Sequence, residues 1–174
     1  RLFPDRKGEL EGWARQFVRD GGETRTEDVL AAMTFAIKKN FRYRSRHEPG
    51  VQGPLQTLQR GTGTCRDFAL LMMEAARSLG LAARFVSGYL HVPVEGSDHV
   101  GGGSTHAWVQ VYLPSAGWVE FDPTNGIVGN RDLIRVAVAH EPRQAIPLWG
   151  TFFGAAADHL AMTVDIDVVS QAGA

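Results

Sequence analysis

The chain has 174 residues, of which 44% are hydrophobic and 21% charged, so it has the composition of a packed globular protein. Its length suits one domain, and we predict that residues 1–174 form a single catalytic domain. The 18 Lys and Arg residues nearly balance the 19 Asp and Glu residues, with a formal net charge of -1. This balance argues against nucleic acid or a membrane surface as the partner.

The single cysteine narrows further the classes of protein to which the chain can belong. Cys65 has no second cysteine to pair with, which excludes an internal disulfide and a cysteine-rich metal site. We therefore expect neither a cofactor nor a metal. A lone thiol persists best in a reducing compartment, so the expected location is the cytoplasm. No membrane span or signal peptide is evident, and a chain that begins with Arg1 is expected to be a fragment of a longer protein.

Apolar residues recur at helical spacing near the N-terminus. They predict a helix over residues 9–20, on the stripe Leu10, Trp13, Ala14, Phe17 and Val18. A second helix is predicted to end near Asn40, with Thr24 and Glu27 forming a capping box at its start. A short helical turn is predicted over residues 55–59.

A third helix, which starts after Thr64, is the most informative. Thr64 is the expected N-cap, Asp67 completes a capping box, and Gly80 ends the helix. The helix is apolar around most of its circumference, which predicts a central, buried position. Cys65 falls in its first turn, where unpaired N–H groups and the helix dipole stabilise a thiolate. That position suits a nucleophile, although a free cysteine is also often a small buried hydrophobic residue.

After Gly80 the apolar residues alternate with period two. The predicted strands are Ala83–His91, Thr105–Leu113, Gly117–Asp122, Ile134–Ala139 and Leu160–Val169. Helices followed by strands predict an α+β fold, in which the cysteine-bearing helix packs on an antiparallel sheet.

The second and third of these strands are predicted to form a hairpin. Their odd-numbered residues are apolar, so the even-numbered residues, including His106 and Asp122, should share the other face. This register requires an odd-length loop or a bulge, for which Gly117 is suited. His106 then lies opposite Asp122 or one diagonal step away, where a carboxylate orients an imidazole. Together with Cys65 these residues form a candidate catalytic triad of nucleophile, base and orienting acid.

Four blocks of sequence carry a family resemblance: GTCRDFA from Gly63, LGLAARFVSGYL from Leu79, THAWV from Thr105 and GWVEFDPTN from Gly117. In this order they resemble the bacterial transglutaminase-like superfamily, which includes cysteine peptidases. The resemblance implies a papain-like core and a Cys-His-Asp triad, and the matching positions are Cys65, His106 and Asp122. Relatives more often have Val-Cys-Gln around the cysteine, where this chain has Arg66 after it. Arg66 either lies beside the thiolate or points to solvent.

The predicted activity is acyl transfer on amide bonds through a thioester, with hydrolysis of a peptide, protein or other amide as the favoured reaction. Transfer of a glutamine acyl group to an amine is one alternative, and a non-catalytic peptide-binding module of the same fold is another. The backbone N–H of Cys65 is a candidate oxyanion donor, with Gln56, Gln59 or Trp108 as the second. The oligomeric state and the natural substrate are not specified by the sequence.

Overall fold

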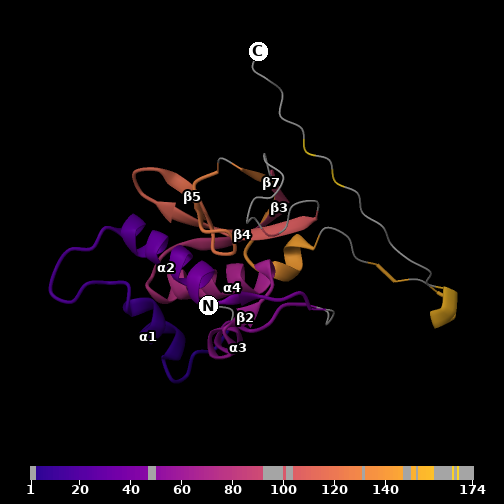
Figure 1. Cartoon of the computed structure of the whole chain (residues 1–174), viewed down its shortest axis with the longest axis horizontal. Helices are drawn as coiled ribbons and strands as arrows, with labels where there is room; N and C mark the ends of the chain where they lie inside the picture. The colour runs from indigo at the N-terminus through magenta and orange to yellow at the C-terminus, as the bar shows by residue number, and fades with distance from the viewer. Residues whose placement is uncertain are drawn as a thin grey trace, which may run out of the picture.

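The protein was analysed as a computed structural model that describes residues 3–46, 50–91, 100, 104–130, 132–146, 150–151, 153–158, 166 and 168. Its centre is an antiparallel five-stranded sheet against which helices pack, as expected for an α+β fold (Figure 1). The predicted strand Leu160–Val169 falls almost entirely outside the described residues and stays a prediction.

The helices before the sheet are α1 (Glu9–Arg15), α2 (Thr26–Asn40), α3 (Pro54–Arg60) and α4 (Cys65–Ser78). The predicted capping box at the start of α2 is wrong, because the Thr24 hydroxyl instead accepts a hydrogen bond from the backbone N–H of Arg19 at 3.0 Å. That bond closes the turn after α1, which ends at Arg15 rather than near residue 20. The N-cap of α2 is Arg25, without a side-chain hydrogen bond.

Helix α4 lies at the centre of the fold, as predicted. The Thr64 side chain accepts a hydrogen bond from the backbone N–H of Asp67, and the Asp67 carboxylate accepts one from the backbone N–H of Thr64. The helix contacts β3 and β4 on one side and α1 and α3 on the other (Figure 1). Phe68, Leu71 and Met72 are fully or almost fully buried there. Each such side chain contributes about 1.5–3 kcal/mol, so the position of α4 is strongly fixed.

The sheet runs in the order β6-β5-β4-β3-β7. Its strands are β3 (Ala83–Leu90), β4 (Thr105–Leu113), β5 (Gly117–Asp122), β6 (Ile127–Val128) and β7 (Leu133–Ala139). A separate parallel pair joins β1 (Arg42–Tyr43) to β2 (Thr62–Gly63), and two short 3-10 helices follow, η1 (Pro142–Ala145) and η2 (Ala156–Asp158). The four predicted strands within residues 83–139 are confirmed, with ends that agree to within one residue.

The β4–β5 hairpin has the predicted register. Val109 pairs with Phe121 and Leu113 with Gly117, which leaves a three-residue loop, and Gly117 has the left-handed φ of 75°. The odd-numbered apolar residues of both strands belong to the main core shared with α4. Trp108, an even-numbered residue, lies in a second small cluster with Val86, Leu90 and Leu133. In this register Asp122 lies opposite Trp108, one diagonal step from His106.

Candidate active site

The hairpin joins His106 to Asp122 by a direct hydrogen bond. His106 Nε2 lies 2.8 Å from Asp122 Oδ2, and both side chains are completely buried. The ring of His106 also stacks on Trp108, with 6.0 Å between centroids and 28° between planes. The imidazole is thus held on one edge by a carboxylate and on one face by an indole, which fixes its orientation.

The Asp122 carboxylate is fixed by further donors. Its Oδ1 accepts hydrogen bonds from the backbone N–H groups of Thr124 at 2.9 Å and Asn125 at 3.3 Å. Its Oδ2 accepts one from the Asn125 side-chain amide at 2.8 Å. Four hydrogen bonds in all, including that from His106, satisfy this buried carboxylate and fix its orientation.

Asn125 connects this carboxylate to distant parts of the chain, a role that the sequence did not predict. Its side-chain oxygen accepts from the backbone N–H of Val100 at 2.8 Å, and its amide donates to the Val100 carbonyl at 3.1 Å. Lys38 of α2 donates to the Asn125 carbonyl at 2.8 Å. The only sequence signal for this residue was its place in the block after Asp122.

The environment of His106 favours the imidazolium form. Burial lowers the pKa of His106, but the Asp122 charge and hydrogen bond and the nearby Cys65 thiol raise it to about 10. Nδ1, the ring nitrogen that does not face Asp122, is buried without a well-aligned hydrogen bond to any described residue. Since hydrogen bonding to the Cys65 side chain still contributes to the raised pKa, the thiol and the imidazole lie close but are imperfectly aligned.

Cys65 is the first residue of α4 and is only 8% exposed. Its backbone N–H has no acceptor among the residues that the structure describes. The neighbouring Arg66 does not point to solvent, because its guanidinium lies 5.5 Å from the Phe85 ring and donates to the Pro142 carbonyl at 3.2 Å. Arg66 therefore anchors η1 beside the first turn of α4.

Asp67, predicted only as a capping residue, also organises the loop in front of Cys65. Besides the Thr64 backbone, its carboxylate accepts from the backbone N–H of Gln52 at 2.6 Å. Arg46 donates to both of its oxygens, at 3.0 and 3.2 Å. The side chain is completely buried, so it ties the segment after β1 and the entry to α3 directly to the turn that carries Cys65.

Comparison with known proteins shows the family to which this chain belongs. Residues 11–123, well over half of the chain, match the family model for the core of the transglutaminase-like superfamily. The chain belongs to the transglutaminase-like superfamily. Transglutaminase-like relatives of this chain include the uncharacterized protein ML0607 of Mycobacterium leprae, which is 36% identical over 126 residues, covering 68% of this chain and 43% of the relative.

Another mycobacterial relative is the uncharacterized protein Rv2569c of Mycobacterium tuberculosis, which is 33% identical over 152 residues, covering 84% of this chain and 48% of the relative. The chain thus spans less than half the length of these curated relatives.

Solved structures show the same transglutaminase-like architecture. A crystal structure from Cytophaga hutchinsonii, described as a "putative cysteine protease", superposes with a TM-score of 0.63 at 26% identity, over 83% of this chain and 47% of that one. Calcium-bound LapG of Legionella pneumophila gives a TM-score of 0.53 at 14% identity, over 75% of this chain and 70% of that one. The likeness to LapG is one of fold alone.

Two of the side chains predicted as second oxyanion donors, Gln56 and Gln59, are exposed on α3 of this transglutaminase-like domain, where Gln59 donates to Glu9 at 3.0 Å. The third, Trp108, stacks on His106 but is completely buried in the second apolar cluster.

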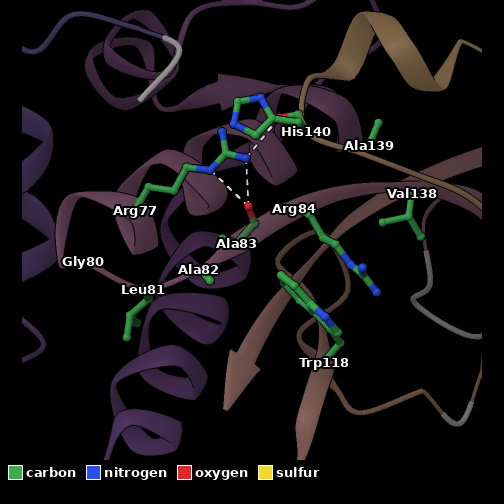
Figure 2. A pocket seen from close by; sticks show the side chains of 10 residues that line it. All are labelled: Arg77, Gly80, Leu81, Ala82, Ala83, Arg84, Trp118, Val138, Ala139 and His140. Carbon is green, nitrogen blue, oxygen red and sulfur yellow. Dashed lines mark hydrogen bonds between the residues drawn. The ribbon is translucent and has the colours of Figure 1, made fainter. Parts of the chain in front are cut away.

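Hollows of different size lie at the two ends of α4. A hollow of about 670 Å³ lies near the C-terminal end of α4, between Arg77, Arg84, Trp118 and His140 (Figure 2). None of the described residues that line it belongs to the candidate triad.

Two smaller apolar hollows, of about 280 and 180 Å³, share Ile146. One is lined by Arg66, the chain neighbour of Cys65, and the other by Thr105, the neighbour of His106.

The residues that the structure describes contain no group of three or more His, Cys, Asp and Glu side chains that could hold a metal ion. No helix among them is both long and apolar enough to cross a lipid bilayer.

Proposed function

We propose that this domain is a thiol-dependent enzyme that hydrolyses amide bonds, with Cys65 as nucleophile, His106 as acid and base, and Asp122 as the orienting carboxylate. The observation that carries the proposal is the buried His106–Asp122 pair with the Cys65 thiol beside it. A structural histidine gains nothing from a neighbouring thiol, whereas a nucleophile requires an adjacent base or imidazolium.

In the proposed reaction the Cys65 thiolate adds to the substrate carbonyl carbon, and a C–S bond forms as the carbonyl oxygen becomes an oxyanion. His106 gives its proton to the leaving nitrogen, the C–N bond breaks and a thioester remains. His106 then removes a proton from water, which attacks the thioester. The C–S bond then breaks, the acid product leaves, and the Cys65 thiolate and the His106 imidazolium are restored. Asp122 holds the imidazole in position throughout and stabilises its positive charge.

The substrate class is supported by the surface beside the thiol. The two small hollows around Ile146 adjoin the chain neighbours of Cys65 and His106 and are lined largely by apolar residues. They suit side chains of an extended peptide rather than a large rigid ligand, since drug-sized pockets measure roughly 300–1,000 Å³. The similar Cytophaga hutchinsonii protein, described as a "putative cysteine protease", favours hydrolysis over amine transfer.

Alkylation of Cys65 by iodoacetamide tests the nucleophile. At pH 6 we expect a rate on the order of 10²-fold above that of a free thiol, which with a pKa of ~8.5 is roughly 0.3% thiolate. His106→Ala should remove most of this advantage. His140→Ala, a change at an exposed histidine on the far side of α4, is the matched control and should retain it. Slow and equal rates in the wild type and His106→Ala would contradict the proposal.

Mass spectrometry of a peptide library with and without an added primary amine separates the possible reactions. Products that gain water support hydrolysis, whereas products that gain the amine would establish the alternative, transamidation. Bound but unchanged peptide would identify a binding module.

A cytoplasmic location is part of the proposal, because a reducing compartment maintains the thiol.

A further inference from the structure

The candidate active site has one evident oxyanion donor. The backbone N–H of Cys65 has no acceptor among the described residues and lies next to the attacking sulfur. Oxyanion stabilisation usually involves at least two preorganised donors. Because Gln56 and Gln59 are exposed on α3 and Trp108 is completely buried, a second donor that substrate can reach must come from another polar group.

The pairing of strand β1 with strand β2 places Tyr43 near the turn that carries Cys65. In the parallel β1–β2 pair Tyr43 lies opposite Gly63, and the backbone N–H of Arg44 donates to the Gly63 carbonyl at 2.9 Å. Gly63 is packed tightly on the first turn of α4, since a Cβ there would lie 2.9 Å from the Asp67 Cβ. Strand β1 is therefore fixed against the turn that holds Cys65, two residues after Gly63.

Tyr43 lies on a strand paired with the segment that leads into that turn, and the residue is 36% exposed. Burial of the hydroxyl and the charges of Cys65 and Asp67 raise the pKa of Tyr43, and a hydrogen bond with the Ser45 side chain partly opposes this. Two residues on the same helical turn thus act on one phenol. The phenol stays protonated at neutral pH and remains a hydrogen-bond donor that solvent and substrate can reach.

We propose that the Tyr43 hydroxyl is the second oxyanion donor, which hydrogen-bonds the substrate oxygen after Cys65 attacks the carbonyl carbon. This assignment rests on the proposed amide hydrolysis and makes Tyr43 a catalytic residue. No proton is transferred: the hydroxyl keeps its hydrogen and stabilises charge that exists only in the tetrahedral intermediate. The contribution should therefore affect turnover rather than substrate binding.

Tyr43→Phe tests the assignment with little change in shape. For a peptide substrate cleaved by the wild type, kcat should fall on the order of 10²-fold while KM changes less than about threefold. A peptide aldehyde, which forms a tetrahedral adduct on the thiol, should bind on the order of 10²-fold more weakly. Alkylation of Cys65 by iodoacetamide should keep its wild-type rate, because displacement of iodide forms no oxyanion. Tyr112→Phe is the matched control, since Tyr112 is 44% exposed and packs on Trp118 away from the triad.

The possible results separate this assignment from the function on which it rests. Wild-type kcat and aldehyde affinity in Tyr43→Phe would overturn the role of Tyr43 and leave the proposed hydrolase standing. Equal losses of turnover and alkylation in a variant with a native circular dichroism spectrum would also overturn it, because Tyr43 would then act on the thiolate. Absence of turnover in the wild type with every peptide would instead overturn the proposed function, and the assignment with it.

Discussion

The two ends of helix α4 differ in which backbone polar groups they leave without a hydrogen-bond partner. At the C-terminal end the last carbonyls are occupied: those of Ala75 and Ala76 both accept from the backbone N–H of Leu79, and Ala76 also accepts from Leu81 at 3.1 Å. At the N-terminal end the backbone N–H of Cys65 has no acceptor among the described residues. The carbonyls of Ala75 and Ala76 thus have backbone partners, whereas the N-terminal end keeps a donor beside a thiol.

Both ends contain a buried ion pair, but with different connections. Glu74 pairs with Arg77, which donates to the carbonyls of Ala83 and His140 and so braces nearby backbone. Asp67 pairs with Arg46 and holds the segments around the turn that carries Cys65. The larger hollow lies at the C-terminal end, away from the candidate triad.

The largest difference between the two ends should appear in turnover. Asp122→Asn should lower kcat on the order of 10⁴-fold, because a neutral amide neither fixes the imidazole nor balances its charge. Arg84→Ala, a change in the large hollow, should alter kcat by less than about twofold. Peptide hydrolysis measured on both variants checks this difference, and comparable losses would place chemistry at both ends.

The buried ion pairs should matter for folding at both ends and for catalysis at one. Asp67→Ala removes the carboxylate that pairs with Arg46, whose side chain is 19% exposed. Glu74→Ala removes the carboxylate that pairs with Arg77, whose side chain is 9% exposed. Each change should lower the free energy of unfolding by about 3–5 kcal/mol in urea titrations. Under conditions in which both variants remain folded, Asp67→Ala alone should also lose turnover, and an equal loss in Glu74→Ala would contradict the comparison.

The charge on His106, at the N-terminal end of α4, predicts that the free energy of unfolding depends on pH. Its pKa is raised from 6.5 to about 10 in the folded protein. The stabilisation from its proton is therefore complete below pH 6.5 and is lost as pH rises through about 10. A Cys65→Ala background removes the thiol's own titration and also its contribution to the raised pKa of His106, so the window in this variant ends below about 10. Within that window the free energy of unfolding should fall by up to about 1.4 kcal/mol per pH unit. Asp122→Asn should abolish most of that slope, and an unchanged slope would show that Asp122 does not hold the proton.

Substitutions at the two caps of helix α4 should have the smallest effects on stability. Thr64→Ala removes the N-cap hydroxyl and should cost about 1 kcal/mol. Gly80→Ala forces an alanine to the φ of 83° that follows the helix and should cost about 1–2 kcal/mol. Thermal unfolding compares them. Only Thr64→Ala should also slow turnover, by a few-fold, because Thr64 fixes the turn that carries Cys65.

Local patterns predicted most of the fold and the identity of the candidate triad. Strands β4 and β5 were assigned with their observed ends, because alternating apolar residues and Gly117 define one register. The capping box of α4 was equally readable, because Thr64 and Asp67 are three residues apart. The start of α2 was not, because Thr24 had two possible partners and the Arg19 backbone occupies its hydroxyl.

The supporting contacts depend on long-range packing that no local pattern encodes. Lys38 and Asn125 are separated by 87 positions, and nothing in either segment specifies the other. The Arg66 side chain can face either solvent or the protein interior. Its contacts with Phe85 and Pro142, which come from distant segments of the chain, decide between the two. Tyr43 belongs to a two-residue strand, too short for periodicity to reveal which residue it faces.

The hairpin also implies an order of events during folding. His106 and Asp122 are 16 residues apart in the chain and belong to neighbouring strands joined by a tight turn, so their pairing closes a short loop. Cys65 reaches them only after α4 docks onto the sheet, which is a non-local step with a larger loop-closure cost. The thiol therefore acquires the imidazole and carboxylate that the proposed mechanism requires only once α4 has docked. Any reactivity of Cys65 above that of a free thiol should accordingly disappear when the protein is unfolded.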